Sequence, residues 1–131
     1  MTDIETRADV EKLVDAFYEQ VREHPSLGPV FDEVAGIDWG THLPRMYAFW
    51  ETVLFHTAGY KGNPVRKHVE LSRKVALTEE LFQAWLHLFS STVDAHFKGS
   101  RATQAKERAT VMGSIMLYKC SQPDAGSLSL I

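Results

Sequence analysis

Hydrophobic side chains in the first part of the chain recur at the spacing of an α-helix. Between residues 10 and 21 they fall at i, i+3, i+4, i+7, i+8 and i+11, in the order Val10, Leu13, Val14, Phe17, Tyr18 and Val21. This period of 3.6 residues places them on one face and predicts an amphipathic helix. The helix should end at His24, because the residue before a proline avoids the helical conformation. A short, tight segment, "SLGPVF", and a polar loop to about Gly40 follow.

The middle of the chain carries a second amphipathic pattern and a short third one. The second helix is expected from its apolar positions, which are Leu43, Met46, Tyr47, Trp50, Val53 and Leu54. Thr41 is its predicted N-cap, because a threonine hydroxyl can accept from the first free backbone N–H groups. The loop "HTAGYKGN" comes next. Asn63 as N-cap and Pro64 at the first helical position then predict a short helix to about Ser72.

Two further helices are expected in the second half. Thr78 is the predicted N-cap of the first, whose stripe is Leu81, Phe82, Trp85, Leu86, Phe89, Val93 and Phe97. Ser100 is the predicted N-cap of the second. Its face carries Ala102, Ala105, Ala109, Met112 and Met116, with Ile115 beside it. No run of alternating residues is long enough for a strand. The sequence therefore predicts an all-α fold in a single domain, residues 1–120, with a C-terminal tail at 121–131.

Composition and charge narrow the class of protein without identifying a function. The chain has 131 residues, of which 44% are hydrophobic and 24% charged, as is common in soluble globular domains. Its net charge of −3 argues against a nucleic-acid partner. The single cysteine, Cys120, excludes an internal disulfide framework. The polar start "MTDIETRADVEKL" is unlike a signal peptide, and no stretch approaches 18 apolar residues, so a cytoplasmic protein without a membrane partner is expected.

Candidate chemistry begins with polar side chains that fall on apolar stripes. Tyr18 and Trp85 lie in two of the predicted stripes, and His42 shares a helical face with Met46 and Trp50. Each of the three can be a core residue whose polar atom bonds to a carbonyl group, and this alternative stays open.

His68 is a fourth candidate, one turn into the predicted short helix. An isolated histidine there can equally be a surface residue. Zinc-type sites are disfavoured, because HExxH, CxxC and histidine pairs at i, i+4 are all missing from the sequence. Haem is different, because the porphyrin supplies four ligands and the protein needs to add only one axial imidazole. A haem pocket also needs an apolar, aromatic lining with a few polar groups.

Five segments carry a resemblance to a known family. The series "LVDAFYEQV", "LGPVF", "DWGTHLPRMYAFW", "YKGNPVRKH" and "FQAWLHLF" resembles the group III truncated haemoglobins of bacteria, over about residues 4–119. This resemblance implies a truncated globin, a 2-on-2 helical sandwich around one haem b (iron protoporphyrin IX). The stretch "VELSRKVALT" departs from the family pattern and leaves the propionate-binding residues open.

The resemblance also implies roles for individual residues. His68 of "GNPVRKH" would be the proximal iron ligand and Tyr18 the distal hydrogen-bond donor. Trp85 would project into the distal site, and His42 would lie over the haem as a gate, a third polar group or a sixth ligand. The remaining pocket residues would be Phe31, Met46, Phe49 and Trp50.

Three functions follow as hypotheses. The first is a haem protein that binds O₂, CO and NO in a polar distal pocket. The second is a haem-dependent NO dioxygenase or peroxidase, which would need an external reductase that the sequence does not identify. The third is a haem-free helical interaction module. The joint presence of His68, Tyr18 and Trp85 counts against the third.

Overall fold

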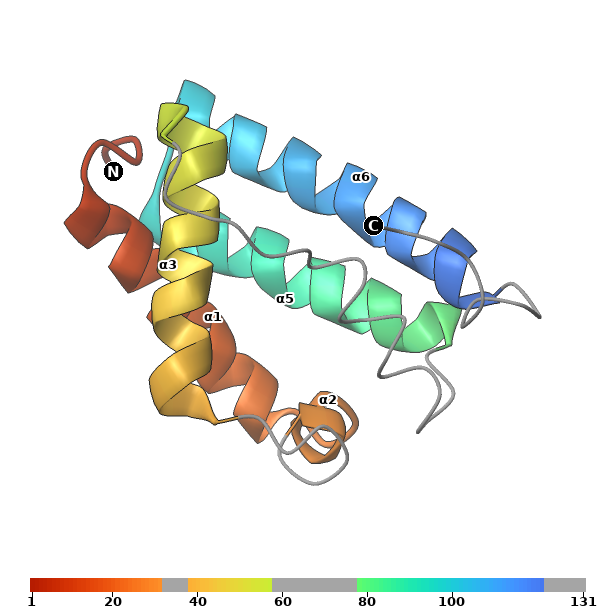
Figure 1. Cartoon of the computed structure of the whole chain (residues 1–131). Helices are drawn as coiled ribbons and strands as arrows, with labels where there is room; N and C mark the ends of the chain where they lie inside the picture. Colours follow the sequence, from red (N-terminus) through yellow and green to blue (C-terminus); the bar gives the residue numbers. More distant parts are fainter. Residues whose placement is uncertain (32–37, 58–77, 122–131) are drawn as a thin grey trace.

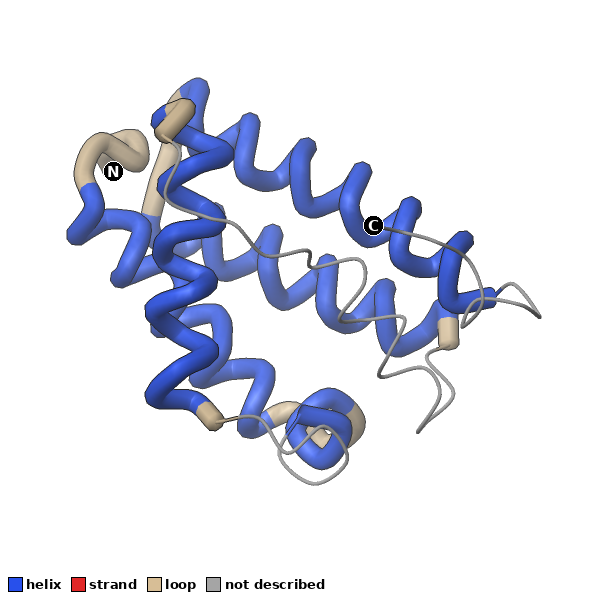
Figure 2. Tube along the Cα trace, in the orientation of Figure 1, coloured by secondary structure: helices blue, strands red, loops and turns tan. Residues whose placement is uncertain are grey.

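The described chain is built from helices alone. A computed structural model describes residues 1–31, 38–57 and 78–121 (Figure 1). Its helices are α1 (Arg7–Glu23), α2 (Leu27–Pro29), α3 (Trp39–Phe55), α5 (Glu79–His96) and α6 (Ser100–Ser121). Figure 2 shows no strand in these three segments, which confirms the all-α prediction. The predicted short helix at 64–72 and the tail beyond residue 121 lie outside the described residues.

The helices pack as two crossing pairs. α1 packs against α3, α5 packs against α6, and α1 also lies against α5 (Figure 1). Within each pair the helices run in opposite directions. The core between the pairs is apolar and rich in aromatic rings, including Phe17, Trp50, Trp85 and Phe89. No helix in the described segments is long and apolar enough to cross a membrane.

α1 follows its sequence pattern closely. All six side chains of the predicted stripe are buried, and they are the only buried ones of this helix. Thr6 caps the N-terminus in a reciprocal arrangement, in which its hydroxyl accepts from the N–H of Asp9 and the Asp9 carboxylate accepts from the N–H of Thr6. The helix ends at Glu23, and His24 is extended before Pro25, as predicted.

α3 begins earlier than the sequence suggested, and the prediction of Thr41 as N-cap is wrong. Asp38 is the N-cap, because its carboxylate accepts from the Gly40 N–H and from the Thr41 hydroxyl, each at 3.1 Å. A carboxylate that accepts both bonds draws Thr41 into the first turn of the helix. α3 ends at His56, which adopts the left-handed conformation with φ of 58°.

Thr78 caps α5 as predicted, but the prediction of Ser100 as the cap of α6 is wrong. Ser100 is the first residue of α6, and the capping carboxylate comes from Asp3 near the N-terminus. Asp3 accepts from the N–H of Arg101 at 3.0 Å and of Ala102 at 2.8 Å. Burial alone would raise the pKa of Asp3, but these bonds and one from the Ile4 N–H outweigh it and hold the pKa below its ordinary value.

Gly99 makes the close approach of Asp3 to α6 possible. It has a φ of 152°, and a Cβ atom there would lie 2.4 Å from Cγ of Asp3. Only glycine tolerates both the backbone angle and the contact. Farther along α6, Ala102, Ala105 and Ala109 are buried as predicted, whereas Ile115 is exposed. The side chain of Met116 lies outside the described residues.

Candidate functional site

Tyr18 lies at the centre of a group of rings contributed by three segments. Its ring meets His42 of α3 edge to face, with centroids 5.1 Å apart. Trp39 lies 5.4 Å from it and Phe31, just after α2, lies 6.2 Å from it. Tyr18 itself is only 8% exposed. The structure therefore brings together three of the residues that the sequence singled out.

Trp85 belongs to a neighbouring stack of rings in the same core. It lies 5.9 Å from Phe17 and stacks on Phe89 at 6.1 Å, and Phe89 in turn stacks on Trp50 at 4.8 Å. Phe17 and Tyr18 are 4.8 Å apart, so adjacent residues of α1 join the two groups. Phe17 thus lies in contact with both Trp85 and Tyr18.

The face of α3 that carries His42 is only partly covered. His42, Met46 and Phe49 recur at i, i+4 and i+7 and are half-buried, whereas Trp50 beside them is buried. Met46 and Phe49 both pack against the core cluster. An apolar helix that keeps such side chains half-exposed offers a surface that a flat, apolar cofactor can cover.

Trp39 is the member of this group that sequence reasoning missed. It stacks on Phe31 at 6.2 Å, meets His42 edge to face at 5.6 Å, and carries the Arg22 guanidinium 4.8 Å from its ring centroid. One available signal was its position three residues before His42, since residues at i and i+3 share a helical face.

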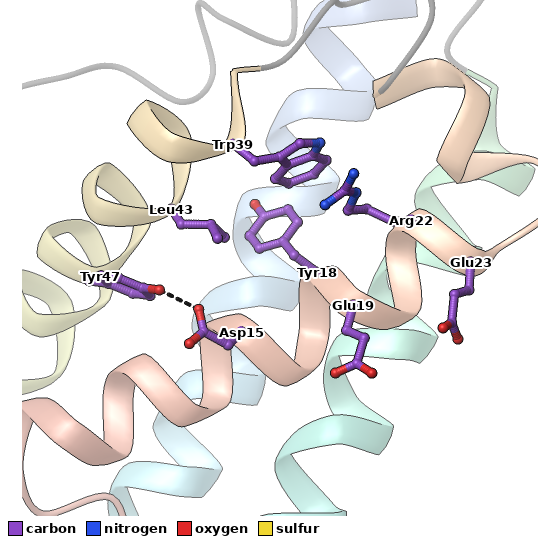
Figure 3. A pocket seen from close by; sticks show the side chains of 8 residues that line it. All are labelled: Asp15, Tyr18, Glu19, Arg22, Glu23, Trp39, Leu43 and Tyr47. Atoms are coloured by element: carbon purple, nitrogen blue, oxygen red, sulfur yellow. Dashed lines mark hydrogen bonds between the residues drawn. The ribbon is translucent and has the colours of Figure 1, made fainter.

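An open pocket of about 560 Å³ lies between α1 and α3 (Figure 3). Its lining combines aromatic and charged side chains: Asp15, Tyr18, Glu19, Arg22, Glu23, Trp39, Leu43 and Tyr47. The hydroxyl group of Tyr47 donates to the Asp15 carboxylate across the two helices. Burial, and then this bond to Asp15, raise the pKa of Tyr47 to about 12.

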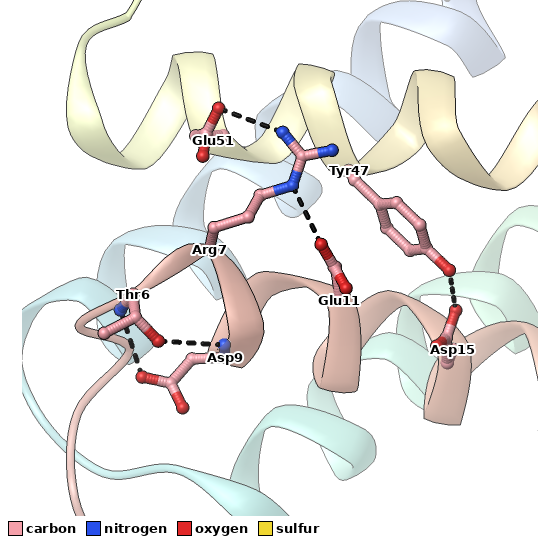
Figure 4. A network of polar contacts seen from close by, with 7 residues as sticks. All are labelled: Thr6, Arg7, Asp9, Glu11, Asp15, Tyr47 and Glu51. Carbon is pink, nitrogen blue, oxygen red and sulfur yellow. Dashed lines mark hydrogen bonds and ion pairs between the residues drawn. The ribbon is translucent and has the colours of Figure 1, made fainter.

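Further polar contacts lie along the same interface between α1 and α3 (Figure 4). Arg7 forms ion pairs with Glu11 on its own helix at 3.1 Å and with Glu51 of α3 at 3.2 Å. The Arg7 guanidinium also lies 5.7 Å from the centroid of the Tyr47 ring. Pairs this exposed each contribute little stability.

The described residues fit the requirements of a haem pocket. Phe31, Met46, Phe49 and Trp50 supply apolar and aromatic surface, and Tyr18, His42 and Trp85 supply polar side chains from three helices. His68, the predicted axial ligand, lies outside the described residues, as do Arg73 and Lys74 of the stretch that follows it.

Comparisons with known proteins show which family the chain resembles. No protein-family model matches the chain. The chain is 31% identical over 116 residues to the group 3 truncated hemoglobin ctb of Campylobacter jejuni, an alignment that covers 84% of this chain and 89% of the relative. Its structure is similar to the crystal structure of a group III truncated hemoglobin from Campylobacter jejuni, with a TM-score of 0.80 and 25% identity. That match covers 93% of this chain and 97% of the other.

Proposed function

From the premise that the chain belongs to the group III truncated haemoglobins, we propose that it binds O₂, CO and NO at the iron of a haem b. His68 would provide the axial imidazole, because one protein ligand is enough for a haem iron. Phe31, Met46, Phe49 and Trp50 would pack on the cofactor. The haem supplies the iron centre where a diatomic ligand binds.

The observation that carries this proposal is the contact between Tyr18 and His42. A phenol from α1 and an imidazole from α3 lie 5.1 Å apart in a group of apolar rings. Because Tyr18 is only 8% exposed, a hydrogen bond made by its hydroxyl group should be stronger than one made in solvent. The Tyr18 hydroxyl and the indole N–H of Trp85 would donate to the ligand and slow its release, and His42 would add a third polar group.

Redox chemistry on the bound ligand is a second candidate function. Three polar side chains that hold a ligand firmly suit NO dioxygenation or peroxide reduction better than O₂ carriage, because carriage requires rapid release. Either reaction would use electrons from an external reductase. A cytoplasmic location, where such reductants are found, stays a prediction.

The absorption spectrum of the purified protein tests the proposal. We expect a Soret band in the ferric and dithionite-reduced protein that shifts sharply when CO is added. His68→Ala should lose most of the haem, whereas His87→Ala, at an exposed position of α5, should keep it. A His68→Ala variant with an unchanged spectrum would overturn the axial assignment. A wild-type protein that takes up no haem even from added hemin would favour the interaction module instead.

A further inference from the structure

Tyr18 connects the pocket between α1 and α3 to the proposed ligand site. It is one of the residues that line the pocket (Figure 3). The same ring lies edge to face with His42. The ring of Tyr18 therefore borders the pocket and contacts His42 as well. The pocket itself is open and holds about 560 Å³.

Trp39 contacts both the pocket and His42. Its indole lines the pocket and also meets the His42 ring at 5.6 Å. Arg22, another lining residue, holds its guanidinium 4.8 Å from the indole centroid, a distance at which cation–π attraction restrains the ring. Tyr18 and Trp39 are thus two lining residues whose rings contact His42.

The rim of the pocket is negatively charged. Asp15, Glu19 and Glu23 recur at intervals of four residues along α1 and are exposed. Arg22 is the single cation among the lining residues, so the lining carries a formal charge of −2. Carboxylates at the mouth of an apolar passage repel approaching anions and leave neutral molecules unaffected.

We propose that this pocket is the entrance through which ligands reach Tyr18 and His42, that Trp39 limits their passage, and that the rim favours neutral ligands over anions. The proposal rests on the proposed function, because it assumes a ligand site beside these two residues. Trp39 acts here as an access residue and takes no part in binding the ligand.

The charge of the rim is tested with one neutral and one anionic probe. The double variant Glu19→Gln/Glu23→Gln should speed azide association with the ferric protein about two- to fourfold at low ionic strength. It should leave CO association with the ferrous protein unchanged. Added salt should speed azide association with the wild type and have little effect on the double variant. Glu107→Gln, at an exposed position of α6, is the matched control. Unchanged azide rates in the double variant, or equal gains in the control, would overturn the entrance assignment.

The role of Trp39 is tested by CO rebinding after flash photolysis. Trp39→Ala should speed bimolecular CO association about tenfold, which corresponds to a modest change in barrier. Trp39→Phe and Arg22→Ala should fall between this variant and the wild type. Hydroxyl-radical labelling of the haem-loaded protein, read by mass spectrometry, should show more oxidation of Tyr18 in Trp39→Ala. Unchanged CO rates and Tyr18 labelling in these variants would overturn the role of Trp39.

The two proposals fail in distinguishable ways. A wild-type protein that binds no CO contradicts the proposed function. A wild type that binds CO, together with variants of unchanged rate, contradicts the entrance alone. If Trp39→Ala does not retain haem, Trp39→Phe, Arg22→Ala and the glutamate pair still decide the outcome, because each keeps an aromatic ring at position 39.

Discussion

The rings of Tyr18 and His42 meet edge to face, 5.1 Å apart, although one belongs to α1 and the other to α3. The contact depends on how the two helices are aligned, and the pairs Tyr47–Asp15 and Arg7–Glu51 also connect these helices. The proposed ligand site and these polar contacts are therefore parts of one interface between α1 and α3. Some variants below remove a polar group from a ring of the ligand site, and others remove a contact between the two helices.

Tyr18→Phe removes the hydroxyl group and keeps the ring. If this hydroxyl donates to bound O₂, its loss should speed O₂ dissociation about tenfold, since a net hydrogen bond contributes about 1–1.5 kcal/mol. The rate is measured by displacing O₂ with CO in a stopped-flow instrument. Tyr118→Phe, on α6 and 62% exposed, is the control and should behave as the wild type. An unchanged rate for Tyr18→Phe would show that Tyr18 is not the donor.

Trp85→Phe tests the second donor in the same assay. The substitution keeps an aromatic side chain beside Phe17 and Phe89 and removes the indole N–H. We expect O₂ dissociation to speed up by about tenfold for the same reason. Phe89→Leu, which alters the same stack of rings without touching a polar group, serves as the comparison. Equal acceleration in both variants would point to altered packing and contradict a specific role for Trp85.

Asp3→Ala should weaken the start of α6. It removes the acceptor of two backbone N–H groups, so the free energy of unfolding at neutral pH should fall by about 1–2 kcal/mol, the cost of losing an N-cap. Because the pKa of Asp3 is lower in the folded protein than its ordinary value of 3.8, this stabilisation is present above that value and is lost as the pH falls further.

Urea unfolding of the wild type and of Asp3→Ala between pH 7 and pH 3 measures the effect. The difference between the two stabilities should shrink toward the acid end. Asp94→Ala changes the same charge at an exposed ion pair with Lys106 and should cost far less. A difference between wild type and Asp3→Ala that stays constant down to pH 3 would contradict a role for the ionised carboxylate.

The pKa of Tyr47 should report on its hydrogen bond to Asp15 across the interface between α1 and α3. Burial, and then the bond to Asp15, raise its pKa from an ordinary 10.0 to about 12. Since the folded protein holds the proton more tightly, the resulting stabilisation is complete below pH 10 and is lost as the pH rises toward 12. The tyrosinate absorbance that disappears in Tyr47→Phe identifies the group.

Asp15→Asn separates the two causes of this shift. It removes the carboxylate and keeps the burial, so the pKa of Tyr47 should move back toward 10.0 without reaching it. Asp94→Asn, on α5, should leave the titration unchanged. If Asp15→Asn had no effect on the titration, the bond between the two helices would be refuted.

His56→Gly should stabilise the protein. His56 ends α3 with a φ of 58°, a conformation that costs a residue with a side chain roughly 1–2 kcal/mol and glycine almost nothing. After the entropy lost by glycine is subtracted, the gain should be about 0.5–1 kcal/mol in thermal or urea unfolding. His87→Gly, inside α5, should instead lower stability by about 0.3–0.5 kcal/mol, the difference between the helix propensities of histidine and glycine. A loss of stability in His56→Gly would contradict the left-handed cap.

The elements that the sequence predicted best are those that depend on local periodicity. The stripe of α1 was identified completely, because each of its buried side chains lies within one turn of the next. The caps were harder to predict. Thr41 and Ser100 are reasonable local choices, but Asp38 lies just before the helix and competes directly with Thr41, and Asp3 reaches Ala102 from the other end of the chain.

In the candidate site, too, the residues marked by a local pattern were predicted, and those that depend on helix packing were not. Tyr18 and His42 stood out because each is a polar residue on an apolar stripe, and the structure places their rings in contact. Trp39 was not predicted as a site residue, because a tryptophan near the start of a helix has no distinctive sequence pattern. Its contacts with Arg22, Phe31 and His42 are visible only in the folded structure. The pocket between α1 and α3 depends on how two helices pack, which no local pattern encodes. The role of His68 rests on the family resemblance and stays a prediction.

The cap that Asp3 provides also has a consequence for the order of folding. Closing a loop between residues 3 and 102 on its own would cost about 4 kcal/mol of chain entropy, more than a cap returns. The bonds from Arg101 and Ala102 to Asp3 can therefore persist only after α1, α5 and α6 have already packed and brought the two segments together. They should be among the last native contacts to form, and their loss should speed unfolding much more than it slows folding.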